Sequence, residues 1–253
     1  MPAMNDIATE LLGSIATEDG SPSTLSQTLY ERLRGEIVGG RLLPGTKLRL
    51  DELRGQYGVS LSPLREALSR LAAEGFVVSE NQRGFNVAPV SRAMFADVIK
   101  MRTALESMAL RESIEKGDED WEVGVVSALH RLKKFEVARS EGQSMEEWEL
   151  RHQEFHLALV GACGSPLLLQ FCTTLRDLND RYRRLFLASY KLDRDVANEH
   201  QAIADAALAH DAEKAVYLLG EHIQRTARNV SAAIGTVRDK PPPPRNSQPR
   251  PDH

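Results

Sequence analysis

GVSLSPLREALSRLAAEGFV, residues 58–77, is the stretch that decides the fold of the N-terminal part of this chain. Three leucines recur in it at helical spacing: Leu64, Leu68 and Leu71. Gly75 follows as a residue type that commonly ends a helix. Ser62 is expected to cap the helix at its start, with Pro63 in the first turn, a favoured arrangement. The stretch therefore predicts a short amphipathic helix whose outward face carries Ser62 and Arg65.

Short elements flank this helix on both sides. Apolar residues at helical spacing predict one helix over 25–37, ended by a glycine pair, and a second over 50–57. Downstream, residues 76–78 and 85–87 enclose a turn and predict a small hairpin. Three short helices followed by a hairpin make a winged helix-turn-helix, which we place at residues 24–90.

Beyond residue 90 the pattern changes to long amphipathic helices separated by Gly, Pro and Asp breaks. We predict helices near 92–116, 119–140, 145–162, 166–190, 194–209 and 212–236. The fold class is therefore mainly α, with an N-terminal winged helix-turn-helix and a C-terminal antiparallel all-helical bundle over 91–236. The proline-rich residues 237–253 and the polar residues 1–23 are predicted to be a disordered tail and arm.

The composition places the chain among globular proteins of the cytoplasm. It has 253 residues, 42% hydrophobic and 27% charged, with a net charge of −4. No apolar run approaches the roughly 20 residues of a membrane span, and no secretory signal opens the chain. We therefore expect no membrane contact. Cys163 and Cys172 fit neither a disulfide framework nor a paired metal motif, and are expected to be buried as small apolar side chains.

Arginines in the N-terminal part are candidates for DNA contacts. A helix-turn-helix inserts the start of its second helix into the major groove, where an arginine can donate to both O6 and N7 of guanine. Arg65 occupies that position. Arg49 and Arg54 precede it, and Arg83 lies in the predicted wing, so these three suit phosphates or the minor groove. Each of the three is equally compatible with a solvated surface arginine.

Four histidines fall on the inward stripes of three predicted helices: His152, His156, His200 and His222. His152 and His156 are four residues apart, so they can bind one ion from adjacent turns. A single inward histidine is more often a core residue. A buried group of imidazoles is costly unless a shared ion satisfies the rings, and neutral imidazole is a good ligand for zinc. The pattern predicts a divalent metal site, with zinc expected and nickel or another transition metal as alternatives.

The stretch 30–87, with PGTKL at 44–48, the quoted 58–77 and NQRGFNV at 81–87, closely resembles the DNA-binding domain of GntR-family bacterial regulators. The helical part resembles the effector domain of the FadR subfamily, called FCD. The resemblance implies a homodimer that binds a short palindromic operator. Carried over by position, the resemblance implies DNA contacts at Ser60, Ser62, Arg65 and Gly84. The family usually has an arginine at the position of Leu61, and often another at the position of Asp51. Because this chain lacks both, the resemblance does not imply that its operator contains the family's usual TGGT half-site.

The same resemblance extends to the metal site. Metal-binding FCD domains carry an Asp-x-x-x-His pair and two later histidines, which align with the four histidines named above. His152 replaces the aspartate, which leaves the site more positive and favours an anionic effector. Arg102 aligns with an arginine that often faces the effector and could clamp a carboxylate, or it pairs with Glu106 one turn on. His130, His210 and His253 do not match and are expected to be structural or solvated.

The chemistry of the effector is suggested by a closer similarity. Residues 146–170 and 81–91 look most like carbon-starvation-induced regulators of the subfamily, which implies a dicarboxylate such as glutarate. The sequence thus predicts a repressor controlled by a small carboxylate at a histidine-ligated ion.

Two other readings remain open. In the first, the metal is purely structural, and the effector binds elsewhere or is absent. The other is a metal-dependent hydrolase, which is disfavoured because Gln153 stands where H-E-x-x-H enzymes have their glutamate, and no other catalytic motif occurs. We therefore predict that the chain is not an enzyme.

Overall fold

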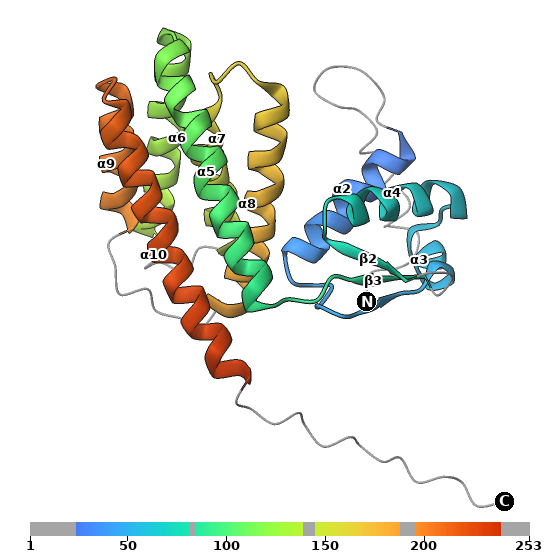
Figure 1. Ribbon diagram of the computed structural model, residues 1–253. Coiled ribbons are helices and arrows are strands. Elements are labelled where there is room, and N and C mark those ends of the chain that lie inside the picture. The colour runs from blue at the N-terminus through green and yellow to red at the C-terminus, as the bar shows by residue number, and fades with distance from the viewer. Residues whose placement is uncertain (1–23, 81–83, 139–144, 188–195, 239–253) are drawn as a thin grey trace, which may run out of the picture.

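A computed structural model describes residues 24–80, 84–138, 145–187 and 196–238 (Figure 1). Three helices and a small sheet form one unit, and long helices form a second beside it. Each unit has its own hydrophobic core. The predicted fold class, mainly α with a winged helix-turn-helix and a helical bundle, is confirmed. The predicted arm and most of the predicted tail lie outside the described residues.

The N-terminal unit packs its helices on one side of a three-stranded sheet. Its helices are α2 (Leu25–Val38), α3 (Leu50–Tyr57) and α4 (Leu61–Ala73), and its strands are β1 (Lys47–Leu48), β2 (Val77–Glu80) and β3 (Gly84–Val87). The strands are antiparallel in the order β1-β3-β2, and Leu48 pairs with Phe85 while Val77 pairs with Val87. The β2–β3 hairpin is the predicted wing.

The recognition helix α4 begins one residue earlier than expected. Ser60, not Ser62, holds the N-cap position, because its backbone is extended while Leu61 is already helical, and its side chain makes no cap hydrogen bond. The prediction that Ser62 caps the helix was therefore wrong, whereas Pro63 does lie in the first turn. The predicted leucine stripe is buried. Gly58 turns the chain between α3 and α4 with φ of 65°, a left-handed conformation that glycine adopts without strain.

The bundle contains six long helices in the described part of the chain: α5 (Arg92–Lys116), α6 (Glu119–Ala138), α7 (Met145–Val160), α8 (Pro166–Leu187), α9 (Val196–Leu208) and α10 (Ala212–Arg238). Helix α5 packs against α8 and α10, and α6 packs against α7. Cys163 and Cys172 are buried, as expected. No helix in the described segments is both long and apolar enough to cross a membrane.

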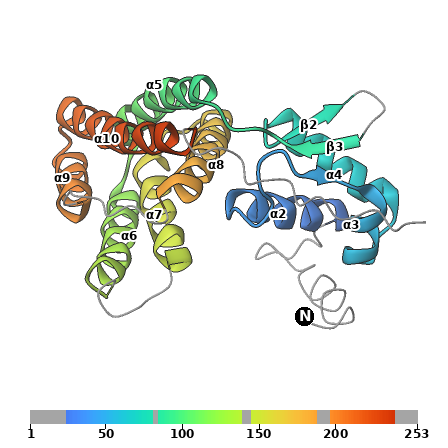
Figure 2. The ribbon, with the colours of Figure 1, turned by 90° about the horizontal axis from the view of Figure 1, so that it is seen from below.

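Helix α8 lies against both units of the molecule (Figure 2). Arg181 donates a hydrogen bond to the carbonyl of Ala88, at the end of the winged unit. The hydroxyl of Tyr182 accepts from the backbone N–H of Ser91 and donates to its carbonyl, each at 3.2 Å. Asp177 forms an ion pair of 2.8 Å with Arg34 of α2. One helix of the bundle thus fixes where the DNA-binding unit sits.

Asp177 at this contact should make stability depend on pH. Burial raises the pKa of Asp177 to about 6, although Arg34 opposes the shift. Since the folded protein holds this proton more tightly than the unfolded chain, Asp177 stabilises the fold below about pH 4, and that stability is lost as the pH rises through about 6. Relative to Asp177→Asn, the free energy of unfolding of the wild type should fall by about 3 kcal/mol between about pH 4 and about pH 7.

Urea unfolding followed by circular dichroism at several pH values measures this difference. A difference between the two proteins that stays constant with pH would contradict the prediction.

Candidate metal centre and DNA-binding face

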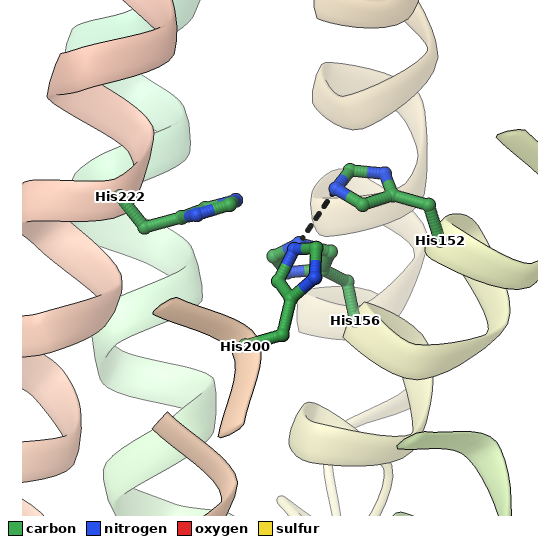
Figure 3. A group of neighbouring side chains, drawn as sticks. All are labelled: His152, His156, His200 and His222. Atoms are coloured by element: carbon green, nitrogen blue, oxygen red, sulfur yellow. Dashed lines mark hydrogen bonds between the residues drawn. The ribbon is translucent and has the colours of Figure 1, made fainter. Parts of the chain in front are cut away.

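The four predicted histidines converge inside the bundle (Figure 3). His152 and His156 extend from successive turns of α7, His200 from α9 and His222 from α10. All four are buried, and one ring nitrogen from each lies within 4.8 Å of the others. Each histidine faces the interior because it lies on the apolar stripe of its own helix.

The cluster fits a metal ion on the evidence of its unsatisfied atoms. The Nε2 atoms of His152 and His156 lie 3.2 Å apart, and within the described segments the Nδ1 atom of each of these two rings is buried without a hydrogen-bond partner. Nitrogens that share a tetrahedral zinc ion at about 2.0–2.1 Å lie roughly 3.3 Å apart. The observed distance between the two Nε2 atoms is close to this value. The two rings are therefore placed as two nitrogen ligands of one ion would be.

A second layer of contacts orients the fourth ligand. The Nδ1 atom of His222 lies 2.9 Å from a carboxylate oxygen of Glu199, whose other oxygen accepts from Arg225 at 3.0 Å. A ring that donates Nδ1–H to a carboxylate presents the lone pair of Nε2, which is the common arrangement of metal-bound histidine. Sequence reasoning did not single out Glu199, although it lies next to His200 in the sequence.

Burial, together with nearby positive charge, keeps His152 and His156 neutral. Burial lowers the pKa of His152 and of His156 well below the ordinary value, and nearby arginines lower it further, Arg183 for His152 and Arg176 for His156. A neutral imidazole keeps the lone pair with which it binds a metal. These two rings are therefore held in the protonation state that an ion requires.

Two buried arginines meet one buried glutamate beside the histidines. Arg102 donates from Nε to Glu106 at 2.7 Å, and Nη2 of Arg176 lies 3.4 Å from the other oxygen of that carboxylate. Burial alone would raise the pKa of Glu106, but the two arginines hold it below its ordinary value. Arg102 thus makes the ion pair with Glu106 that the sequence left open as an alternative.

The pairing leaves guanidinium groups unsatisfied. Among the described residues, Nη2 of Arg102 and the Nε and Nη1 atoms of Arg176 are buried without a hydrogen-bond partner, while Nη2 of Arg176 has only its 3.4 Å contact with Glu106. Two positive charges against one negative charge, with free N–H donors, make a place that suits an anion. Sequence reasoning missed Arg176. The available signal was a polar stripe at core spacing along α8, which includes Arg176, Asn179 and Arg183.

Helix α8 carries a second buried arginine near the cluster. Arg183 pairs with Glu149 of α7 and lies 3.2 Å from Asp180, while its guanidinium stacks over the ring of Trp148 at 5.2 Å. Trp148 in turn stacks on His152, with ring centroids 4.7 Å apart. This arginine is compensated by acids, and it serves to hold the His152 side of the cluster.

The candidate DNA contacts lie on one face of the winged unit. Arg49, Arg65 and Gly84 line a cleft of about 600 Å³ between the start of α3, α4 and the wing, together with Lys47, which sequence reasoning did not name. The side chain of Arg65 is exposed, and Arg49 lies 3.3 Å from Glu52.

Ser60 and Ser62 lie exposed at the N-terminal end of α4, and Arg54 is exposed on α3. Arg83 lies outside the described residues.

The remaining histidines stay away from the cluster. His130 is exposed on α6. His210 is also exposed, where its ring lies 3.1 Å from the carbonyl of Ile114 and 3.0 Å from Glu122. His253 lies outside the described residues.

Comparison with known proteins places both units in described families. The model named "Bacterial regulatory proteins, gntR family" matches residues 25–87, and the FCD domain model matches residues 97–225. The HTH-type transcriptional regulator BphR of Paraburkholderia xenovorans (strain LB400) is 40% identical over 203 residues, which cover 79% of this chain and 83% of BphR. The HTH-type transcriptional repressor GlaR of Escherichia coli (strain K12) is 37% identical over 198 residues, covering 77% and 90%.

Solved structures agree with this assignment. A GntR family member from Pseudomonas syringae pv. tomato str. DC3000 is 27% identical with a TM-score of 0.52, covering 93% of this chain and 96% of that one. McbR/YncC of E. coli shares the fold at 22% identity, with a TM-score of 0.71 over 85% of this chain and 99% of that one. The chain therefore belongs to the GntR family of bacterial regulatory proteins and is a DNA-binding transcriptional regulator with an FCD domain, not an enzyme.

Proposed function

We propose that this regulator is a cytoplasmic repressor, active as a homodimer, whose binding to operator DNA is controlled by a small carboxylate at a histidine-ligated divalent ion. The observation that carries the proposal is the set of buried guanidinium nitrogens of Arg102 and Arg176 that have no hydrogen-bond partner in the described part of the chain and lie beside the four-histidine cluster. The direction of control is supported by GlaR, whose name describes a repressor.

The four imidazoles would hold the ion. Zinc suits a set of nitrogen ligands, and nickel or another transition metal also accepts imidazole. When bound, the ion supplies a positive charge that attracts a carboxylate oxygen. All four ligands are neutral, so none of them offsets that charge. Replacement of the family's aspartate by His152 thus favours an acid over a neutral effector.

Arg102 and Arg176 would bind a carboxylate through their free N–H groups. Glu106 fixes both arginines from one side, so their unpaired nitrogens are oriented before the ligand arrives. An acid with two carboxylates has one group for the ion and one for the arginines. A short dicarboxylate such as glutarate therefore fits this arrangement better than a monocarboxylate.

Helix α8 offers a route from the anion site to the DNA-binding unit. Arg176 faces the cluster, and its sequence neighbour Asp177 is paired with Arg34 of α2. Gln153, the neighbour of His152, donates to the same Asp177 at 3.2 Å. A ligand that shifts α8 relative to α7 would move this contact and thereby the orientation of the recognition helices. By linkage, operator DNA must change the affinity for the effector by the same factor.

On the DNA side, Arg65 would read a guanine in the major groove, with Ser60 and Ser62 at the start of α4 near the backbone. Arg49, Arg83 and Gly84 would contact phosphates or the minor groove from the edges of the cleft. If the metal is purely structural, these residues keep their roles in DNA binding, but carboxylates do not change the affinity for the operator.

The metal site can be tested by zinc titration. Wild-type protein should bind one Zn²⁺ per chain, measured by calorimetry. His156→Ala removes a ligand and should weaken binding by more than the roughly 10–100-fold expected for Glu199→Gln, which removes an orienting contact only. His130→Ala, an exposed histidine on α6, is the matched control and should bind zinc as the wild type does. Equal affinity in His156→Ala and the control would exclude the four-histidine site.

The anion site can be tested on zinc-loaded protein. Glutarate at about 100 times its Kd should stabilise the native state by about 2.7 kcal/mol, which raises Tm. Arg176→Gln should abolish that rise while zinc still binds, whereas Arg111→Gln, an exposed arginine paired with Glu213, should leave it intact. If no organic acid in a broad panel shifts Tm, the structural reading of the metal is favoured.

The DNA face can be tested with an operator selected from random DNA. Arg65→Ala should lose about 1–3 kcal/mol of binding free energy and accept other bases at one position. Arg49→Ala should weaken all sequences alike and reduce the salt dependence of binding by about one phosphate contact. Fluorescence anisotropy at several salt concentrations measures both. Loss of affinity without a change in base preference in Arg65→Ala would assign that residue to the backbone.

A further inference from the structure

A polar stripe runs along the inner side of α8. Arg176, Asn179 and Arg183 follow one another at steps of three and four residues, so they lie on the same side of the helix. Their exposed fractions are 1%, 1% and 7%, so the stripe is buried inside the bundle. Arg183 is held by Glu149, and the proposed anion site uses Arg176. Neither that site nor the proposed metal site uses Asn179.

The side-chain amide of Asn179 is satisfied on one side only. Its Nδ2 atom donates to a carboxylate oxygen of Asp180 at 3.3 Å. Its Oδ1 atom is buried and has no hydrogen-bond partner in the described part of the chain. Turning the amide over would not relieve this, because Oδ1 would then face the carboxylate of Asp180, and two acceptors repel each other. A buried acceptor without a donor is costly, so this oxygen requires a donor from a ligand.

The position of Asn179 on α8 directs its side chain toward the histidines of α7. Burial lowers the pKa of His152 most, and the charge of Arg183 is the next cause. For His156, burial again comes first, and the charge of Arg176 is the next cause. The two arginines of the stripe thus lie close to the two histidines. Because Asn179 lies between the arginines on the same side of α8, its oxygen faces the same region.

A plain dicarboxylate would satisfy only the donors of this site. Its ionised carboxylates are acceptors, so they can bind the N–H groups of Arg102 and Arg176 but leave Oδ1 of Asn179 without a donor. A hydroxyl group on the carbon chain between the carboxylates would supply the missing hydrogen. An ammonium group could also donate, but two arginines and a divalent ion make the surroundings positive and disfavour a cationic substituent.

We propose that the effector is a hydroxy-dicarboxylate and that Asn179 determines this specificity by accepting a hydrogen bond from the hydroxyl group. The inference rests on the proposed carboxylate sensor and names the ligand class of the same site. A site with a buried acceptor for a ligand hydroxyl discriminates against the analogue that lacks it, because the acceptor stays unpaired in that complex. Glutarate would therefore bind more weakly than its 2-hydroxy derivative.

The test compares acids that differ by one hydroxyl group, on zinc-loaded, full-length protein. Calorimetry gives the Kd of glutarate and of both enantiomers of 2-hydroxyglutarate, and likewise of succinate and malate. In the wild type, the better enantiomer of a hydroxy acid should bind at least about 10-fold more tightly than the plain acid. Asn179→Leu should abolish this preference while glutarate and zinc still bind. Asn198→Leu, which removes an exposed amide from α9, is the matched control and should keep the preference.

Asn179→Ala provides the same comparison with a smaller side chain if the leucine variant fails to fold, which far-UV circular dichroism reports. If the wild type binds no acid of either kind, the carboxylate sensor itself is wrong. If glutarate binds as tightly as the hydroxy acids, only the hydroxyl inference fails. A preference that persists in both variants would assign the hydroxyl to the ion or the arginines, and a loss of zinc affinity would assign Oδ1 to a histidine. Either result would overturn the role of Asn179.

Discussion

The structure depends on how a helical bundle accommodates polar groups in its interior. Four imidazoles and the guanidinium groups of Arg102 and Arg176 are buried where a bundle of this size would ordinarily hold leucine and valine. Burying such groups without partners costs several kcal/mol each. Glu106 compensates for only part of the positive charge. The interior therefore favours the binding of a cation by the rings and of an anion by the arginines, and this requirement underlies the proposed sensor.

Helix α8 links the elements of the molecule. One side carries Arg176 and Arg183 toward the histidines, and another carries Asp177 and Arg181 toward the DNA-binding unit. Because a helix moves as a rigid body, a change on one side of α8 is felt on the others. Ligand and operator would thus act on a single element, which gives the regulator a physical route for coupling them.

The DNA-binding unit, in contrast, is stabilised by its own hydrophobic core. Leu64, Leu68 and Leu71 pack beneath α4 and leave Arg65 exposed to the outside. The rigid core fixes the direction in which the arginine points, and the wing closes the cleft beside it. The bundle can therefore change where this unit is held without altering how it reads bases.

The sequence determined the elements and the histidines, because helical periodicity is local: residues three and four apart share a face wherever the helix is placed. Hence the winged unit, the six helices and the four histidines of the cluster could be predicted. The N-cap of α4 at Ser60 could not, since the exact residue at which a helix starts depends on backbone conformation. Only the tertiary structure brought Arg176 to Glu106, Glu199 to His222 and Asp177 to Arg34. These pairs join separate helices, and periodicity along one helix carries no information about which helix packs opposite it.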